Sequence, residues 1–561
     1  MSLLQTYFPT VCDASGQRSI RLTIHHAIYF LLLFVLAGAQ SVSKFMMSGM
    51  EILLAVNWAL EWDMRRKFTA DGRLRANPLL GAFVVLMCIH LAWMIPSDNT
   101  AYGWDDIFKK LPLLAIPLVV LTSQPLNRKQ LTWLFFTFTA TVFVATIIGR
   151  IRLATIADLP YREIIPFISH IRFSLNVCLA LTLSVWFLTE RYKKLSQRKG
   201  RSGIAICLTD WLSWVVIVMM ASFVDFLLLL RSYTAFIILF MTASIVLAAY
   251  WKRIHSKGLR IGIASLLGAM LAVVCTVSTV MVHRYYDMIP LATAPLATTT
   301  ANGNPYTHKS DGLIENGNII NHYICKEELR QEWSKRSALD IDSPTPNEYS
   351  ICLTLIRYLN ALGTTKDSVG MQLLDKDDVA AIEKGIANPI YIKGNAIEKM
   401  YYVMLFEYEC HRKTGAVKGF TMAQRLELWK NAWTVFLKHP IGGVGTGDVV
   451  DECHRQLEAD KSQLAGTTKH AHNQYLTLLV AFGIVGFAII AVAFVRALRK
   501  ERLLQLPVAA ALICIILISF VSEDTIETLA GCVFSTLFLC LLTVWHRETV
   551  AEQVTGNTPQ Q

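Results

Sequence analysis

Charged residues are scarce in this chain of 561 residues, since Asp, Glu, Lys and Arg make up 17% of it and apolar residues 53%. This scarcity excludes a disordered chain, which is polar throughout, and an ordinary soluble domain, which has a charged surface. The apolar residues fall into runs of roughly 17–25, the length that crosses a bilayer core. The sequence therefore predicts an all-α, polytopic integral membrane protein.

Motifs with a fixed chemistry are missing as well. His470 and His472 lie two apart, but no HExxH or CxxC pattern accompanies them, so no metal site is expected. No Gly-Lys-Ser/Thr follows the glycine-rich stretch 442–447, which excludes a P-loop. The run Leu22–Ala39 lacks the small-x-small exit of a cleavable signal peptide and is expected to stay as a helix.

Hydropathy predicts about twelve spans. They are 22–41, 43–62, 79–96, 110–123, 131–149, 172–189, 205–229, 233–251, 261–282, 472–495, 507–521 and 529–545. The chain divides accordingly into a membrane domain with nine spans (1–282), a large loop (283–471), three further spans (472–546) and a tail (547–561). The fourth span is short and contains Pro112 and Pro117, which makes it the weakest of the twelve.

The net charge of +11 follows a topological pattern. Lys and Arg gather in alternate loops such as 191–201 and 252–260, whereas Asp98, Glu523 and Asp524 lie in loops on the other side. This alternation obeys the positive-inside rule, so it predicts cytoplasmic termini and an outer large loop. It also explains the basic charge without a nucleic-acid partner.

A few arginines run against this rule. They are Arg150, Arg152, Arg162 and Arg172 around one outer loop, and Arg231 between two spans. A guanidinium matches phosphate bidentately, so these residues indicate an anionic ligand or, alternatively, ion pairs with acids such as Asp158 and Glu163. Asp225 precedes Arg231 by one turn and a half and is interpreted as its ion-pair partner.

The large loop begins with an Ala/Thr/Pro/Gly-rich linker and then shows helical periodicity. Helices are predicted from 351, at 375–384, at 396–412 and at 422–439, forming a small cap. Its cysteines are Cys325, Cys352, Cys410 and Cys453, for which an oxidising compartment leaves three disulfide pairings open. No cysteine lies near a base, so a catalytic cysteine is not expected.

The end of this loop holds the candidate binding residues. Arg425 and Trp429 lie four apart on one helix face, where they either hold a phosphate beside an indole or form a surface arginine over a core tryptophan. Gly443, Gly445 and Gly447 permit close approach of the backbone to an anion, or alternatively make a tight turn after the helix.

The strongest candidate for chemistry is His472, followed by Asn473. An imidazole at a membrane interface, directly before an apolar span, is either a general base or a helix-capping residue. The residues Arg425-x-x-x-Trp429, the His439–Gly447 stretch, and His472-Asn473 followed after nine residues by Gly483-x-x-Gly486 resemble the O-antigen ligase and polymerase superfamily. The topology, with a large loop before the last three spans, resembles that family as well.

This resemblance implies a bacterial inner-membrane enzyme that works on the periplasmic side. The donor is a glycan on undecaprenyl diphosphate, the ligase acceptor is a hydroxyl of lipid A–core, and neither metal nor cofactor is required. By the same resemblance His472 is the essential histidine, Arg425 the arginine of the large loop, and Arg231 the arginine that begins a span. Arg150 and Arg172 are expected to assist in binding the donor.

Other functions remain open at this stage. Within the same superfamily, a polymerase extends the glycan on its lipid, and an oligosaccharyltransferase attaches it to Ser or Thr of a protein. A transporter of lipid-linked sugars is the alternative from another class. It predicts polar residues through the spans and an inverted repeat, whereas Glu51, Asp210 and Asp225 are the strong intramembrane candidates and no repeat is evident.

Overall fold

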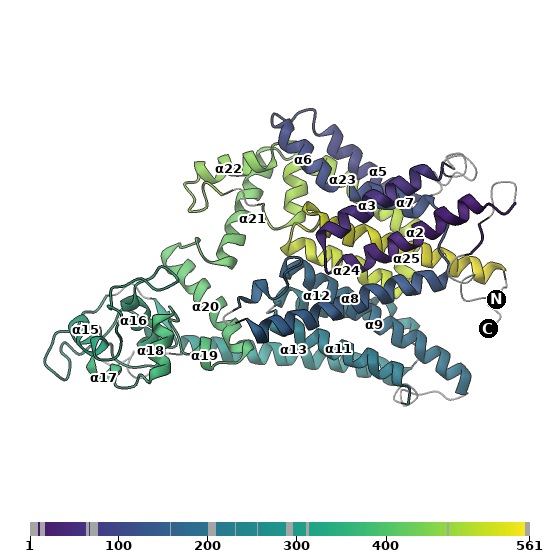
Figure 1. Ribbon diagram of the computed structural model, residues 1–561. Helices are drawn as coiled ribbons and strands as arrows, with labels where there is room; N and C mark the ends of the chain where they lie inside the picture. Colours follow the sequence, from purple (N-terminus) through teal and green to yellow (C-terminus); the bar gives the residue numbers. More distant parts are fainter. Residues whose placement is uncertain are drawn as a thin grey trace. The chain divides into compact units, whose positions relative to one another are not determined.

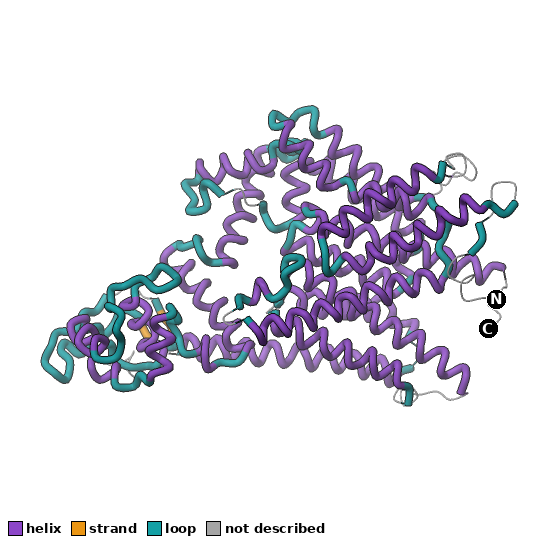
Figure 2. The backbone as a smooth tube through the Cα atoms, in the orientation of Figure 1, coloured by secondary structure: helices purple, strands orange, loops and turns teal. Residues whose placement is uncertain are grey.

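A computed structural model describes most of the chain. The described residues are 9–11, 17–62, 67, 77–156, 159–199, 209–230, 232–254, 256–287, 295–309, 313–467 and 470–555. They form two compact units, one from Met1–Arg260 with Leu428–Gln561, called unit 1, and one from Ile261–Glu427, called unit 2. Helices are the main secondary structure of both, and unit 2 also contains long loops (Figure 2).

Unit 1 holds the apolar helices. In chain order they are α2 (Ile20–Ala39), α3 (Lys44–Leu60), α5 (Pro78–Ala92), α6 (Thr100–Lys110), α7 (Pro112–Thr122), α8 (Arg128–Thr155), α9 (His170–Lys199), α11 (Trp211–Leu229), α12 (Tyr233–Tyr250), α22 (Val449–Ala459), α23 (Gln474–Lys500), α24 (Pro507–Ser522) and α25 (Leu529–Thr555). Two helices cross the unit boundary, α13 (Lys257–Tyr286) and α21 (Thr421–Lys438).

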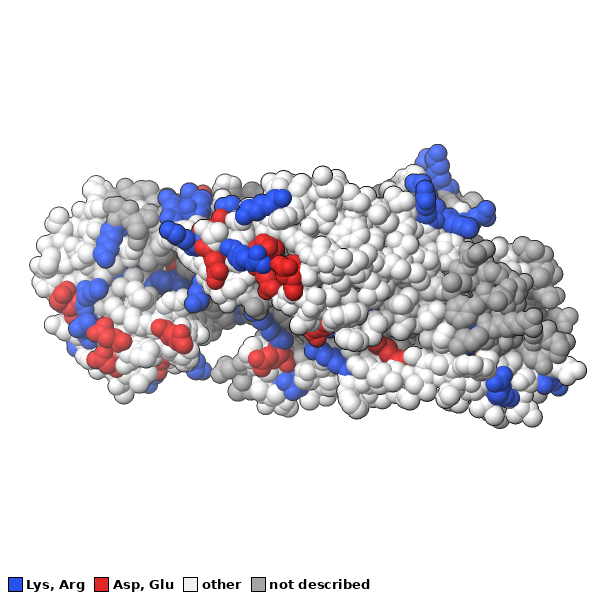
Figure 3. Space-filling view, turned by 90° about the horizontal axis from the view of Figure 1, so that it is seen from above, with Lys and Arg blue, Asp and Glu red and all other residues white. Residues whose placement is uncertain are grey.

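The prediction of an all-α membrane fold is confirmed. A helix occupies each of the twelve predicted segments, and among the described residues eight helices are long and apolar enough to cross a membrane. The other four, α3, α5, α7 and α24, have 17, 15, 11 and 16 residues. On the face drawn in Figure 3, a wide area carries almost no charged side chains, as contact with lipid requires.

The helices of unit 1 pack around α25. Of the apolar window of α25, 89% is buried, against 22% for α12, so α25 is central and α12 peripheral. The helix pairs α2–α3, α7–α25 and α5–α23 lie side by side (Figure 1). Phe138 and Phe538, both fully buried, bring α8 and α25 together with ring centroids 4.3 Å apart.

Unit 2 contains short helices around its own core. They are α15 (Lys326–Ser334), α16 (Ile351–Ala361), α17 (Ser368–Met371), α18 (Lys376–Glu383), α19 (Ile390–Lys393) and α20 (Ala396–Thr414), with a hairpin of β1 (Ile314–Glu315) and β2 (Asn318–Ile319). The predicted helices of the loop are confirmed as α16, α18, α20 and α21. Trp333, Tyr358 and Ile382 are buried in this core.

A polar network lies inside unit 2. The Glu315 carboxylate, fully buried, accepts two hydrogen bonds from the Arg357 guanidinium at 3.0 and 3.1 Å and a further one from Tyr402. Lys366 is 1% exposed, and its ammonium donates to Asn360 Oδ1 at 2.9 Å. Cys325, Cys352 and Cys410 of this unit are free thiols.

Candidate functional site

His472 lies at the entrance to α23, where its backbone is fixed by a carboxylate. Asp524 belongs to the turn between α24 and α25, residues 523–528, called the 523–528 turn. Its Oδ2 accepts the His472 N–H at 2.7 Å, and its Oδ1 accepts the Asn473 N–H at 3.1 Å and the Thr477 hydroxyl at 2.8 Å. His472 has a φ of 50°, a left-handed conformation that a non-glycine residue adopts only when its surroundings impose it.

The imidazole of His472 is open to solvent on one side. Its side chain is 41% exposed, whereas Asp524 is buried, and Nδ1 lies 4.0 Å from Asp524 Oδ2. Burial raises the pKa of Asp524, and the charge of Glu527 raises it further. A partly exposed imidazole beside a carboxylate can accept a proton from a hydroxyl group.

Asn473 is the N-cap of α23. Its side-chain oxygen accepts the Leu476 N–H at 3.1 Å, which satisfies one of the free donors at the helix start. This caps the helix that follows His472 and so fixes the direction in which the chain enters α23. A contact of Asn473 with substrate stays a prediction.

A second carboxylate ties the same turn to α6. Glu527 Oε1 accepts the Gln474 amide at 2.7 Å, and its Oε2 lies 2.6 Å from the Lys110 ammonium. Lys110 also pairs with Asp106 at 2.6 Å, one turn earlier in α6. Burial opposes ionisation of Glu527, but the adjacent Lys110 charge outweighs it and lowers the pKa of Glu527 to about 2. Through its contacts with Lys110 and Gln474, Glu527 joins α6 to the start of α23.

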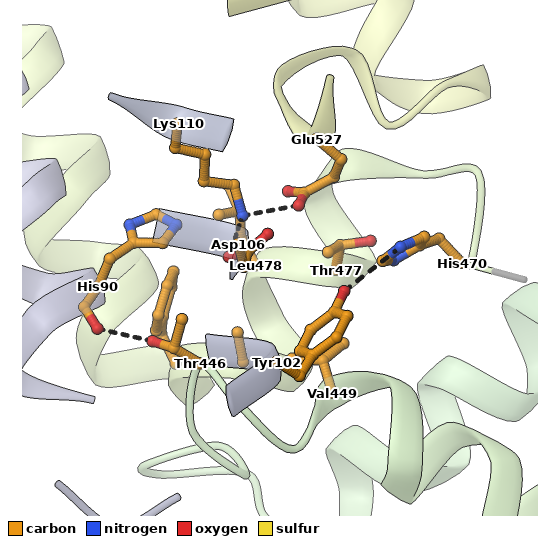
Figure 4. Close-up of a pocket in the computed structure, with 12 residues that line it drawn as sticks. His90, Tyr102, Asp106, Lys110, Thr446, Val449, His470, Thr477, Leu478 and Glu527 are labelled. Atoms are coloured by element: carbon orange, nitrogen blue, oxygen red, sulfur yellow. Dashed lines mark hydrogen bonds and ion pairs between the residues drawn. The ribbon is translucent and has the colours of Figure 1, made fainter. Parts of the chain in front are cut away.

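A small cavity lined by both polar and apolar side chains lies beside these groups (Figure 4). Its volume is about 20 Å³, which admits a water molecule and is too small for a sugar ring. Lys110 and Glu527 meet at one side, and at another the Tyr102 hydroxyl lies 3.5 Å from His470 Nε2. His90, which is buried, lines the cavity with an Nε2 that has no hydrogen-bond partner among the described residues.

Arg172 contacts the 523–528 turn. Its Nε donates to the Thr528 hydroxyl at 2.6 Å, and one terminal nitrogen donates to the Asp524 carbonyl at 3.2 Å. His472, Asn473 and Arg172, all singled out from the sequence, therefore meet at one turn. Binding of substrate by Arg172 stays a prediction, because the contacts seen here hold the turn itself.

The glycine-rich loop packs against a break in α23. Gly483 has φ 61° and ψ −169°, which interrupts the helix. The N–H groups of Gly443, Gly445 and Gly447 donate to His439 O, Ala481 O and Ser97 Oγ at 3.0, 2.9 and 3.0 Å. A methyl group on Gly443 would overlap the Ala481 carbonyl oxygen. These glycines are needed for close backbone packing, and their role in anion binding stays a prediction.

Arg150 contacts α11 instead of the 523–528 turn. Its guanidinium donates to the Ser222 hydroxyl and carbonyl at 3.0 and 2.8 Å and pairs with Asp225 at 2.8 Å. This pairing joins α8 to α11. The expected ion pair of Asp225 with Arg231 stays a prediction. Arg231 itself lies outside the described residues.

Arg425 and Trp429 lie in α21, one turn apart as predicted. Arg425 is in the part of the helix that belongs to unit 2, and Trp429 is in the part that belongs to unit 1. Trp429 is half-buried, and its indole N–H is buried without a hydrogen-bond partner among the described residues. Their contacts with a donor stay a prediction.

Sequence reasoning missed several residues of this site. In the sequence, Asp524 and Glu527 were used only as acidic residues of an outer loop that support the topology, and Lys110 was placed at the edge of a predicted span. One signal was present: Asp106 and Lys110 are spaced i, i+4 in an amphipathic segment next to spans, where charge is costly unless paired. Within the described residues, no group of three or more His, Cys, Asp or Glu is arranged to hold a metal.

Comparison with known proteins identifies one segment. A family model described as O-antigen ligase matches residues 390–491, which include Arg425, Trp429, the three glycines and the His472–Asn473 pair. No curated protein matches the chain. The matched segment supports the O-antigen ligase superfamily, so the resemblance found in the motifs is confirmed at that level.

Proposed function

Because residues 390–491 match a family model described as O-antigen ligase, we propose that the chain is an O-antigen ligase-type glycosyltransferase of the bacterial inner membrane. It moves a glycan from undecaprenyl diphosphate to a hydroxyl of lipid A–core on the periplasmic side. The single observation that carries this proposal is the His472–Asn473 pair. It lies inside the matched segment, its backbone is held by Asp524, and its imidazole is exposed.

In the proposed reaction His472 is the general base. Its ring nitrogen accepts the proton of the acceptor hydroxyl as the oxygen attacks the anomeric carbon. The bond from that carbon to the diphosphate breaks, and the electron pair leaves with the diphosphate. Asp524 favours the imidazolium that forms 4.0 Å away, as a carboxylate does beside a catalytic histidine.

The leaving group gains negative charge as its bond breaks, so cationic groups are required there. We assign this role to the guanidinium groups of Arg231 and Arg425, which bind phosphate oxygens bidentately. Arg172, Arg150 and Trp429, with the glycine-rich loop, are assigned to donor binding. The diphosphate linkage already activates the sugar, and this step needs no nucleotide.

The first test compares two histidine variants in cells. His472→Ala is expected to insert normally and to abolish capping of lipid A–core. His283→Ala, whose side chain is 67% exposed on α13, is the matched control and is expected to cap fully. Full capping by His472→Ala overturns the proposal. Loss of long chains alone in a deletion strain indicates a polymerase, and loss of a glycoprotein indicates an oligosaccharyltransferase.

The second test uses purified components. Full-length protein is incubated with an undecaprenyl-diphosphate-linked glycan and lipid A–core, and the capped product is separated by gel electrophoresis. We expect transfer that persists in the presence of a divalent-cation chelator. Transfer that stops with the chelator contradicts the metal-independent mechanism, while leaving the substrates as proposed.

A further inference from the structure

The end of α21 and the loop after it expose a group of large apolar side chains. Trp433, Leu437 and Ile441 are 47%, 58% and 69% exposed, and they are called the 433–441 face. The same part of α21 also packs inward, because Leu428 and Val435 are buried in unit 1. Single exposed apolar residues are common on proteins in water, but three such residues within nine positions indicate a surface that contacts an apolar partner.

The 433–441 face adjoins the exposed side of a membrane helix. Pro440 O accepts the Ile484 N–H at 2.8 Å, and Ile441 O accepts the Val485 N–H at 3.2 Å. α23 is one of the helices that are long and apolar enough to cross a membrane. Its exposed apolar stripe consists of Ile484, Val485, Ile489, Val492 and Val495. Such a stripe on a membrane span faces lipid, and the 433–441 face continues it at the end next to Ile441.

The depth of Ile441 in the bilayer follows from its contact with α23. The first charged residue after the stripe is Arg496, which is 11 residues after Val485. At about 1.5 Å per residue, Val485 lies roughly 16 Å from that charged end along the helix. The hydrocarbon core of a bilayer is about 30 Å thick, so Val485 and the Ile441 carbonyl bonded to it lie within the depth of the acyl chains.

The backbone of the loop after α21 suits this depth. Irregular backbone in a membrane requires internal hydrogen bonds, because no water is present to replace them. The N–H groups of Val444 and Gly445 donate to the carbonyls of Val480 and Ala481, both at 2.9 Å, in addition to the two bonds from residues 484 and 485. The loop and the break in α23 thus satisfy each other, and the loop can expose Ile441 to an apolar surrounding.

We propose that the 433–441 face contacts the phospholipid bilayer, and that the second half of α21 is an interfacial membrane element of the large loop. Acyl chains contact Leu437 and Ile441, and Trp433 is of a residue type that is enriched at the level of the headgroups. Lys430 and Lys438 are exposed beside this face and are suited to anionic headgroups. The contact is independent of the proposed glycosyl transfer.

The test is photocross-linking of the full-length protein in vesicles of phosphatidylethanolamine and phosphatidylglycerol. Benzoylphenylalanine is incorporated at position 437 or at position 441, and lipid adducts are measured by mass spectrometry after irradiation. Position 492 in the stripe of α23 is the positive control. Position 459, exposed at the end of α22 beside Asp460 and Lys461, is the matched control in a charged surrounding. We expect adduct yields at 437 and 441 within about threefold of that at 492 and about tenfold above that at 459.

Other outcomes overturn the proposal and identify what covers the face instead. Yields at 437 and 441 as low as at 459 show that the face is in water. A cross-linked dimer shows that a second copy covers it, and a cross-link within the chain shows that another part of the same protein does. In vesicles that also contain undecaprenyl phosphate, adducts mainly with that minor lipid assign the face to a polyprenyl chain. Because no arm measures glycan transfer, failure here leaves the proposed function standing, and the reverse also holds.

Trp433 supplies a second readout. Tryptophan emission in vesicles of acyl-brominated phospholipid is compared between the unchanged protein and Trp433→Phe. The chain has 13 tryptophans, and we expect Trp433→Phe to lose about one tryptophan's share of the emission that the bromines quench. Trp333→Phe is the control, because Trp333 is buried in the core of unit 2, and it is expected to leave the quenched emission unchanged. Unchanged quenched emission in Trp433→Phe overturns the contact of this residue with lipid.

Discussion

The His472 N–H donates to Asp524 Oδ2 at 2.7 Å, and the imidazole Nδ1 of the same residue lies 4.0 Å from that oxygen. One carboxylate thus fixes the backbone of His472 and faces its ring. The two residues are 52 apart in sequence, and the contact joins the entrance of α23 to the turn after α24.

We expect Asp524→Asn to lower kcat about 10- to 100-fold with little change in KM for the donor, because an amide cannot stabilise an imidazolium as a carboxylate does. Transfer kinetics with purified protein measure this. Asp105→Asn, an acid on α6 whose side chain is 60% exposed, is the matched control and is expected to keep full activity. Equal activity of the two variants contradicts the role given to Asp524.

We expect Gly443→Ala and Gly483→Ala to destabilise the protein. Both glycines have positive φ, of 70° and 61°, and an added methyl group would overlap a backbone carbonyl. The conformation alone costs a non-glycine residue about 1–3 kcal/mol. Thermal unfolding in detergent measures the loss, with Gly49→Ala as control because its added methyl group would meet nothing within 4 Å. An unchanged melting temperature of Gly443→Ala contradicts the close packing of Gly443 against the Ala481 carbonyl.

Arg172 is tested by separating its two possible roles. Thr528→Val removes the hydroxyl that accepts from Arg172 Nε and leaves the guanidinium in place. If Arg172 also binds the diphosphate, Arg172→Gln raises KM for the donor about tenfold more than Thr528→Val does, because a charge-assisted bond contributes about 1.5–3 kcal/mol. Donor titrations at fixed acceptor measure this. Equal effects of the two variants show that Arg172 only supports the turn.

Lys366 makes the stability of unit 2 depend on pH. Burial lowers its pKa to about 8 from the ordinary 10.5, although Glu315 opposes the shift. Below pH 8 the folded chain holds a buried ammonium, and between pH 8 and 10.5 the unfolded chain binds more protons than the folded one. The free energy of unfolding therefore rises with pH across that window, by about 3 kcal/mol in order of magnitude.

We expect Lys366→Met to remove this rise. Hydrogen exchange of the α16 amides, corrected for the intrinsic rate at each pH, reports the stability of unit 2 within the full-length protein. The unchanged protein is expected to gain protection from pH 8 to 10 more steeply than the variant. Parallel curves for the two proteins contradict the buried charge.

The helices were predictable because their causes are local. A run of apolar residues long enough to cross a bilayer specifies a helix wherever the chain folds, and α16, α18, α20 and α21 followed from apolar spacing alone. The residues of the His472 motif were also recognisable in the sequence. His472, Asn473, Gly483 and Gly486 lie within 15 residues, so their spacing can be read without a structure.

The supporting groups were not predictable in this way. Asp524 and Glu527 lie in one turn, more than 400 residues after Lys110. In the sequence the two acids were indistinguishable from other outer-loop acids such as Asp98 and Asp105, and Lys110 lay at the edge of a predicted span. Nothing in the sequence indicated the pairing of Asp225 with Arg150, because the two residues are 75 apart in the chain. Such choices depend on which helices pack together.

By itself the sequence determined that this protein is helical, lies in a membrane and carries a His-Asn pair before an apolar span with Gly483 and Gly486. Those features depend on composition and on spacing over a few turns. Only the tertiary structure decided that Asp524 holds His472 and that Lys110 and Glu527 join α6 to the same place. A buried charge is paired with a residue that is close in space, and hydropathy along the chain does not indicate which residue that is.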